Sequence, residues 1–276
     1  MTFLSRSPVT QALVVFFAVF LPTLLLTPAA ANPNAVLQSV VLQILLVALV
    51  PLAFVHLSNL DKRTALSLRP ITAKSFFWCV LLAISVLFLL DEIALWQEQL
   101  TGVRASLSPE IQKLLRADSA LQLVWIFFAL ALTPAICEEL LFRGFILGRF
   151  LETGQPGQSL MMSSLLFGLF HRNLAALLPT SLAGLMLAFV VWRTGSLYCG
   201  IVMHVLVNTW AILVVNTKLG EFLPWTHQPS QVPVGLLVVS VLGVVVAGMQ
   251  LQRKRIPRPC QQDAPQATWE QEAKER

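Results

Sequence analysis

The sequence has few charged residues for its length. Only 12% of its 276 residues are Asp, Glu, Lys or Arg, whereas 56% are hydrophobic, and the mean hydropathy is +0.74. A soluble domain carries about 25% charged residues, so most of this surface must face lipid. The apolar residues also fall in blocks of roughly 16 to 24, the length of a membrane span. We therefore predict an integral membrane protein whose surroundings are the lipid bilayer.

Paired cysteines and common metal motifs are also lacking. The four cysteines form no CxxC pair, which argues against a disulfide framework and a cysteine-rich metal site. No HExxH zinc motif occurs. The net charge of +5 comes from basic residues at the ends of apolar blocks, as membrane topology requires. No aromatic-basic patch accompanies them, so nucleic acid is not an expected partner.

Eight apolar blocks are predicted to cross the membrane. They must be helices, because backbone polar groups in lipid have to bond within their own segment. The predicted fold class is therefore all-α, a polytopic transmembrane bundle of about eight helices. The blocks are Gln11–Leu26, Ala35–Leu57, Phe76–Leu95, Leu121–Cys137, Ser159–Leu178, Thr180–Trp192, Leu197–Val215 and Val232–Met249.

Basic residues predict the orientation. With the N-terminus in the cytoplasm, the basic residues that fall inside are those of the loop Asp61–Lys74, Arg143, Arg149, Arg193 and the cluster 253–255. Both termini are then cytoplasmic. Residues 1–31 are either a cleaved signal, because small residues end them, or a retained first helix, which we favour. We divide the chain into N-terminal membrane helices (1–118), a catalytic core (119–216), a final helix with its loop (217–251) and a disordered tail (252–276).

Three clusters of polar residues interrupt the apolar blocks, and such groups are functional candidates at membrane depth. In the first cluster, Glu138 and Glu139 point about 100° apart on a helix, so they cannot share one task. Arg143 lies at i+4 from Glu139, the spacing of a helix ion pair. That pair would leave Glu138 free for chemistry. The alternative is a salt-bridge cluster that ends a span.

The other two clusters contain histidines. Phe167 and His171 lie four apart within the fifth block, and His204 and Asn208 lie four apart in the seventh. Each pair alone is equally compatible with a polar clasp between helices. Together with Glu138 they offer a general base and hydrogen-bond donors for an oxyanion, which is what activation of water in an apolar site requires.

These clusters resemble the three motifs of the CAAX-protease and bacteriocin-processing family, which includes the type II CAAX prenyl endopeptidases. The motifs read Glu138-Glu139-xxx-Arg143, Phe167-xxx-His171 and His204-xxx-Asn208, in the family's order. The resemblance covers roughly residues 120–215 and implies an endopeptidase that hydrolyses a peptide or protein substrate near the membrane. It implies a bacterial inner membrane location.

By this resemblance, Glu138 activates water, His171 assists, and His204 and Asn208 form the oxyanion hole. Glu139, Arg143 and Phe167 are supporting residues. The cofactor is either none or zinc. In a zinc enzyme the metal ligands would be Glu138, His171 and His204. The site is expected to open towards the cytoplasm, because Glu138 falls near the inner end of its predicted span.

Two other functions fit parts of the sequence. A non-proteolytic scaffold or bacteriocin-immunity protein would keep the fold without turnover. A small transporter would line a path with the same polar residues, but transporters commonly show repeated halves, and we find no repeat.

Overall fold

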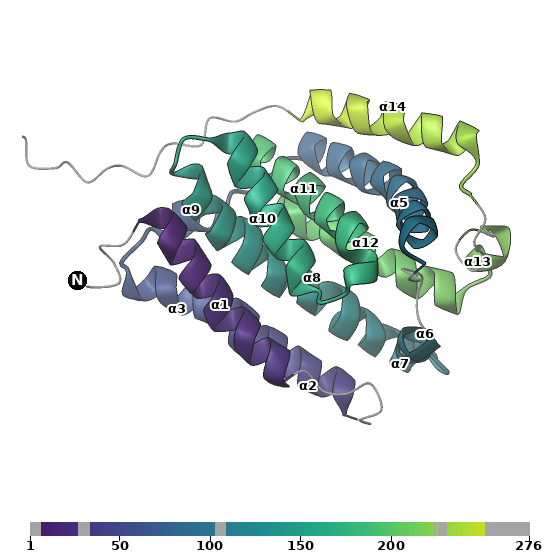
Figure 1. Ribbon diagram of the computed structural model, residues 1–276, viewed down its shortest axis with the longest axis horizontal. Helices are drawn as coiled ribbons and strands as arrows, with labels where there is room; N and C mark the ends of the chain where they lie inside the picture. The colour runs from purple at the N-terminus through teal and green to yellow at the C-terminus, as the bar shows by residue number, and fades with distance from the viewer. Residues whose placement is uncertain (1–6, 27–33, 103–108, 224, 226–230, 252–276) are drawn as a thin grey trace, which may run out of the picture.

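The computed structural model describes residues 7–26, 34–102, 109–223, 225 and 231–251. Helices alone make up the regular structure of this described part, and they pack side by side as a bundle (Figure 1). The predicted all-α fold is therefore confirmed. The predicted cleavage region around residues 27–33 and the tail from residue 252 lie outside the described residues.

Six helical runs among the described residues are long and apolar enough to cross a membrane. A seventh, α14 (Val234–Gln250), is apolar but shorter. The six are α1 (Pro8–Leu26), the run of α2 (Ala35–Leu42), η2 (Gln43–Ala48) and α3 (Leu49–Leu57), α5 (Ala73–Thr101), the run Ala120–Leu151, the run of η5 (Leu174–Ala176) and α11 (Leu177–Thr194), and α12 (Leu197–Asn216). Short helices in the connections are α4 (Lys62–Ala65), α6 (Pro109–Leu115) and α13 (Leu219–Phe222).

The fifth predicted span is shorter than expected. Its helix, α10, runs only over Pro156–Phe170, which at 1.5 Å per residue is about 22 Å, less than the hydrocarbon core. The chain leaves the helix because Arg172 adopts a positive φ of 54°. Leu178, predicted to end this span, instead belongs to α11. His171 consequently lies at a helix end rather than inside a continuous helix.

The fourth predicted span is longer than expected. One run of 32 residues comprises α7 (Ala120–Ile126), η3 (Phe127–Leu132), α8 (Thr133–Glu139), η4 (Leu140–Ile146) and α9 (Leu147–Leu151). Cys137 therefore does not end the span, and Glu138 lies in its interior rather than near its inner end. The expectation that the site opens towards the cytoplasm assumed that Glu138 lies near the inner end of its span. That assumption was wrong.

Two π-helical segments, η3 and η4, flank α8 in this run. The backbone N–H of Thr133 bonds to the carbonyl of Phe128, five residues earlier. A proline cannot supply a helical N–H bond, and Pro134 follows directly at the start of α8. Short π-segments are frequent at functional sites because they change the direction in which side chains point. Glu138 and Glu139 lie between the two segments, at the C-terminal end of α8.

The core surrounds this run of helices. Phe142 and Phe145 of η4 are almost fully buried, and the Phe142 ring contacts the rings of Phe16 and Phe167 edge to face. The first helix, α1, contributes Ala12, Val15, Phe16 and Val19 to the same core. Because α1 packs against α9 and η4, the first apolar block is an integral part of the bundle.

Candidate active site

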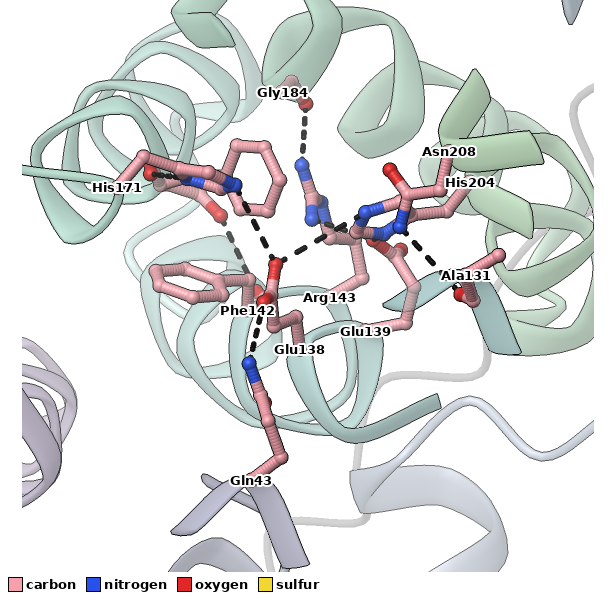
Figure 2. A network of polar contacts seen from close by, with 12 residues as sticks. Gln43, Ala131, Glu138, Glu139, Phe142, Arg143, His171, Gly184, His204 and Asn208 are labelled. Carbon is pink, nitrogen blue, oxygen red and sulfur yellow. Dashed lines mark hydrogen bonds and ion pairs between the residues drawn. The ribbon is translucent and has the colours of Figure 1, made fainter. Parts of the chain in front are cut away.

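Two adjacent carboxylates end α8 inside the bundle. Glu138 is 5% exposed and Glu139 is fully buried. Figure 2 shows that their side chains point towards different partners, as the 100° step of a helix requires. The two residues can therefore serve different roles.

Glu139 belongs to a buried ion pair. Its Oε1 accepts a hydrogen bond from Nη1 of Arg143, one turn later, and contacts Nδ1 of His204 at 3.0 Å. The Arg143 guanidinium also donates to the carbonyl of Gly184 at 3.0 Å and lies 4.1 Å from the centre of the Phe167 ring. The pair joins α12 and α11 to the helix that carries Glu138, so it holds the site together.

Glu138 has two oxygens in different surroundings. Its Oε1 accepts a hydrogen bond of 2.9 Å from Nε2 of Gln43. Its Oε2 is buried and has no hydrogen-bond partner among the described residues. The Nε2 atoms of His171 and His204 lie 3.8 Å and 4.0 Å from this Oε2. One oxygen is thus held in place, and the other faces two imidazoles (Figure 2).

His171 follows the last residue of α10 and is the most accessible of these groups, with 36% of its side chain exposed. Its Nδ1 contacts the carbonyl oxygen of Phe167 at 2.9 Å. A carbonyl oxygen only accepts hydrogen bonds, so Nδ1 carries the proton. In the neutral ring, Nε2 is then an acceptor facing Glu138.

A side chain from α5 holds the segment after His171. Gln97 donates to the carbonyls of Leu174 and Ala175 at 2.8 Å and 2.6 Å, and it accepts from the N–H of Leu178 at 3.0 Å. The buried amide therefore pairs with three backbone groups. It fixes the turn between α10 and α11, and with it the position of His171.

Asn208 lies one turn after His204 on α12 and is partly buried. Its Nδ2 lies 3.5 Å from the carbonyl oxygen of Ala131, the outer limit of a hydrogen bond. Figure 2 shows the Asn208 amide beside the His204 ring. A donor held this weakly is available to a substrate.

Close packing of α12 against α8 depends on Gly200. A Cβ atom at this position would lie 2.6 Å from Oε2 of Glu139 and 2.8 Å from a methyl carbon of Val191. Real Cβ contacts are not this short, so glycine permits the approach. The same approach brings His204, one turn further on, to the carboxylates.

Comparison with known proteins identifies part of the chain. Residues 120–210 match the family described as type II CAAX prenyl endopeptidase Rce1-like. This segment, which we call the Rce1-like core, is therefore similar to that family over about a third of the chain. The Rce1-like core contains all seven residues that the motifs single out, and the described helices show it lies within a membrane bundle.

One curated relative supports this identification. YdiL of Bacillus subtilis (strain 168), a protein described provisionally as a membrane peptidase, is 28% identical over 100 residues. The alignment covers 36% of this chain and 41% of the relative, so the chain matches about two fifths of that protein's length. A comparison with solved structures returned no match.

The structure adds two residues to those predicted from the sequence. Gln43 bonds to Glu138 from outside the Rce1-like core, and Gly200 allows α12 to approach Glu139. Neither had a local signal: Gln43 is one of two glutamines in its apolar block, and Gly200 is one of 13 glycines. Three-dimensional contacts alone reveal them.

Proposed function

We propose that the protein is an intramembrane endopeptidase in which Glu138 activates the hydrolytic water. One observation carries the proposal: a buried carboxylate oxygen without a partner faces the Nε2 atoms of two histidines from two other helices. A water molecule can lie about 2.8 Å from this oxygen and from the Nε2 atom of either histidine, because the separations of 3.8 Å and 4.0 Å are each less than twice that distance.

Glu138 is the general base in this mechanism. Its Oε2 takes a proton from water, and the water oxygen bonds to the carbonyl carbon of the scissile peptide. The carbon–nitrogen bond of the resulting tetrahedral intermediate then breaks. The proton held by Glu138 passes to the departing nitrogen, which leaves as an amine. The products are a carboxylic acid and an amine, and Glu138 returns to its starting state.

His171 orients the water. Its Nε2 is an acceptor in the neutral ring, since Nδ1 bonds to the Phe167 carbonyl. Nε2 can therefore accept the second hydrogen of the water while Glu138 takes the first. Because His171 is also the exposed member of the site, it lies where the substrate enters.

His204 and Asn208 stabilise the oxyanion. The proposed role takes the His204 ring in its imidazolium form, because Nδ1 bonds to Glu139 and Nε2 donates only when both ring nitrogens carry protons. Asn208 supplies a neutral amide donor one helical turn away. Two donors of this kind match the oxyanion holes of acyl-transfer enzymes.

Replacing Asn208 by alanine is expected to lower kcat by about a hundredfold to a thousandfold, the usual effect of losing one oxyanion donor. The melting temperature should change little, because the only hydrogen bond lost among the described residues is the 3.5 Å contact with Ala131. Steady-state kinetics and thermal unfolding of the purified variant measure both. An unchanged kcat would remove Asn208 from the oxyanion hole.

A zinc ion is the alternative activator of the water. Glu138, His171 and His204 offer suitable donors, and a bound zinc would lower the proton affinity of its water. In a tetrahedral zinc site, however, ligand atoms lie roughly 3.3 Å apart. The observed separations of 3.8 Å and 4.0 Å are wider, and the described residues include no cluster with metal-binding geometry. The arrangement does not fit a bound zinc without movement of these side chains.

We accordingly expect activity without a bound metal. Cleavage should persist after prolonged treatment with a chelator, and elemental analysis of the active preparation should find far less than one zinc per chain. Loss of activity with the chelator, followed by recovery on adding zinc, would instead assign these three residues as metal ligands.

The substrate class follows from the surroundings of the site. Six apolar runs place the polar cluster among membrane-spanning helices, so a substrate must be a peptide or protein segment that lies in or against the lipid bilayer. We propose an inner-membrane protein with both termini cytoplasmic, as the basic residues indicate.

The proposal is tested with protein purified in detergent and a library of membrane peptides. Wild type is expected to cut a subset of peptides, which mass spectrometry identifies by their new ends. Glu138→Ala and His171→Ala should leave them intact. Cleavage that continues in both variants would remove these residues from the mechanism. A library left uncut by wild type in several detergents and in liposomes would favour a scaffold without turnover.

A further inference from the structure

A residue outside the Rce1-like core contacts the reactive carboxylate. Gln43 begins η2 in the second apolar run, 95 positions before Glu138 in the sequence. The two segments, η2 and α8, pack against each other. From there the Gln43 amide reaches Oε1 of Glu138 at 2.9 Å (Figure 2).

The direction of this hydrogen bond follows from the chemistry of the two groups. An ionised carboxylate accepts hydrogen bonds and donates none, so the amide nitrogen of Gln43 must face Glu138. The amide oxygen of Gln43 is then turned away, and it is buried without a partner among the described residues. The bond to Glu138 is therefore the one side-chain hydrogen bond that the Gln43 amide makes among the described residues.

The bond makes the two oxygens of Glu138 unequal. Rotation about the last bond of a glutamate side chain has broad, shallow preferences, so an unpaired carboxylate would not hold one oxygen towards the histidines. Gln43 occupies Oε1. The other oxygen, Oε2, is thereby left facing Nε2 of His171 and His204.

We propose that Gln43 is a positioning residue that selects Oε2 of Glu138 as the reactive oxygen, an inference that rests on the proposed function. The second apolar run is then part of the active site, although the matched segment begins only at residue 120. Gln43 also begins the π-helical segment η2, which is consistent with this role because such segments are frequent at functional sites.

The test replaces Gln43 by methionine, which has a similar length and no hydrogen-bond donor. With the best-cleaved library peptide as probe, kcat should fall roughly tenfold to a hundredfold with little change in KM, because the base is misoriented and the binding surface is kept. The matched control is Gln38→Met, the same change at an exposed position of α2 in the same run, which should match wild type. Gln43→Leu serves as the second variant if Gln43→Met does not fold.

A second background separates positioning from a general structural effect. In Glu138→Asp the carboxylate is withdrawn by one carbon, out of reach of Gln43. Adding Gln43→Met to this variant should then lower kcat by less than twofold. Equal fold losses in both backgrounds, or a wild-type kcat for Gln43→Met, would overturn the inference.

Failure of the inference and failure of the proposed function give different results. If wild type cuts the peptide and Glu138→Ala does not, while Gln43→Met retains full kcat, only the role of Gln43 is lost. If Glu138→Ala cuts as fast as wild type, the proposed function and the role of Gln43 are lost together.

Discussion

Glu138→Gln is expected to lower kcat by about a thousandfold while the protein remains folded. Glutamine has the shape of glutamate but cannot take a proton from water, and general-base catalysis contributes roughly a hundredfold to ten-thousandfold. The hydrogen bond from Gln43 to Oε1 can persist, because the amide oxygen of glutamine also accepts. Burying an amide is less costly than burying a carboxylate, so the melting temperature should stay at the wild-type value or rise.

The measurement pairs single-turnover cleavage with thermal unfolding of the same preparation. Glu221→Gln is the matched control, since it makes the same chemical change at an exposed glutamate of α13 and should behave as wild type. A folded Glu138→Gln protein that cleaves at the wild-type rate would show that another group is the base.

The membrane bundle and most of the site could be predicted from the sequence because their signals are local. Apolar blocks of span length predict helices in lipid, since the backbone has no other partner there. Polar residues inside such blocks are conspicuous, and spacings of four residues place Glu139 with Arg143 and His204 with Asn208 on common helix faces. The structure places Arg143 against Glu139 as that spacing predicts.

Other features depend on contacts that no local pattern encodes. The end of α10 at Phe170 was missed because Leu174, Ala175 and the residues after them continue the apolar block beyond His171. That end is held by Gln97, 77 positions away from Leu174. The two π-segments beside α8 were missed because a π-turn changes the helix by one residue and leaves its hydropathy unchanged. Gln43 was missed because nothing in its own block distinguishes it.

The largest expected loss of stability comes from the cation paired with Glu139. Arg143 is 1% exposed, so Arg143→Met would leave the Glu139 carboxylate buried with only His204 beside it. Removing one partner of a buried ion pair costs about 3–5 kcal/mol in the free energy of unfolding, or roughly 10 °C in melting temperature for a chain of this size. Thermal unfolding in detergent measures this loss.

Removing both charges tests whether the loss comes from the orphaned carboxylate. In Glu139→Gln with Arg143→Met, no unpaired ion remains, so about half or more of the lost stability should return. Activity should not return in full, because the neutral amide oxygen that replaces the carboxylate at position 139 binds the Nδ1 hydrogen of His204 more weakly than the carboxylate does. Recovery of stability without full activity would show that the adjacent glutamates have different roles. Glu139 then holds three helices together, and Glu138 activates water. A double variant as unstable as Arg143→Met would show instead that the guanidinium stabilises the bundle mainly through Gly184 and the Phe167 ring.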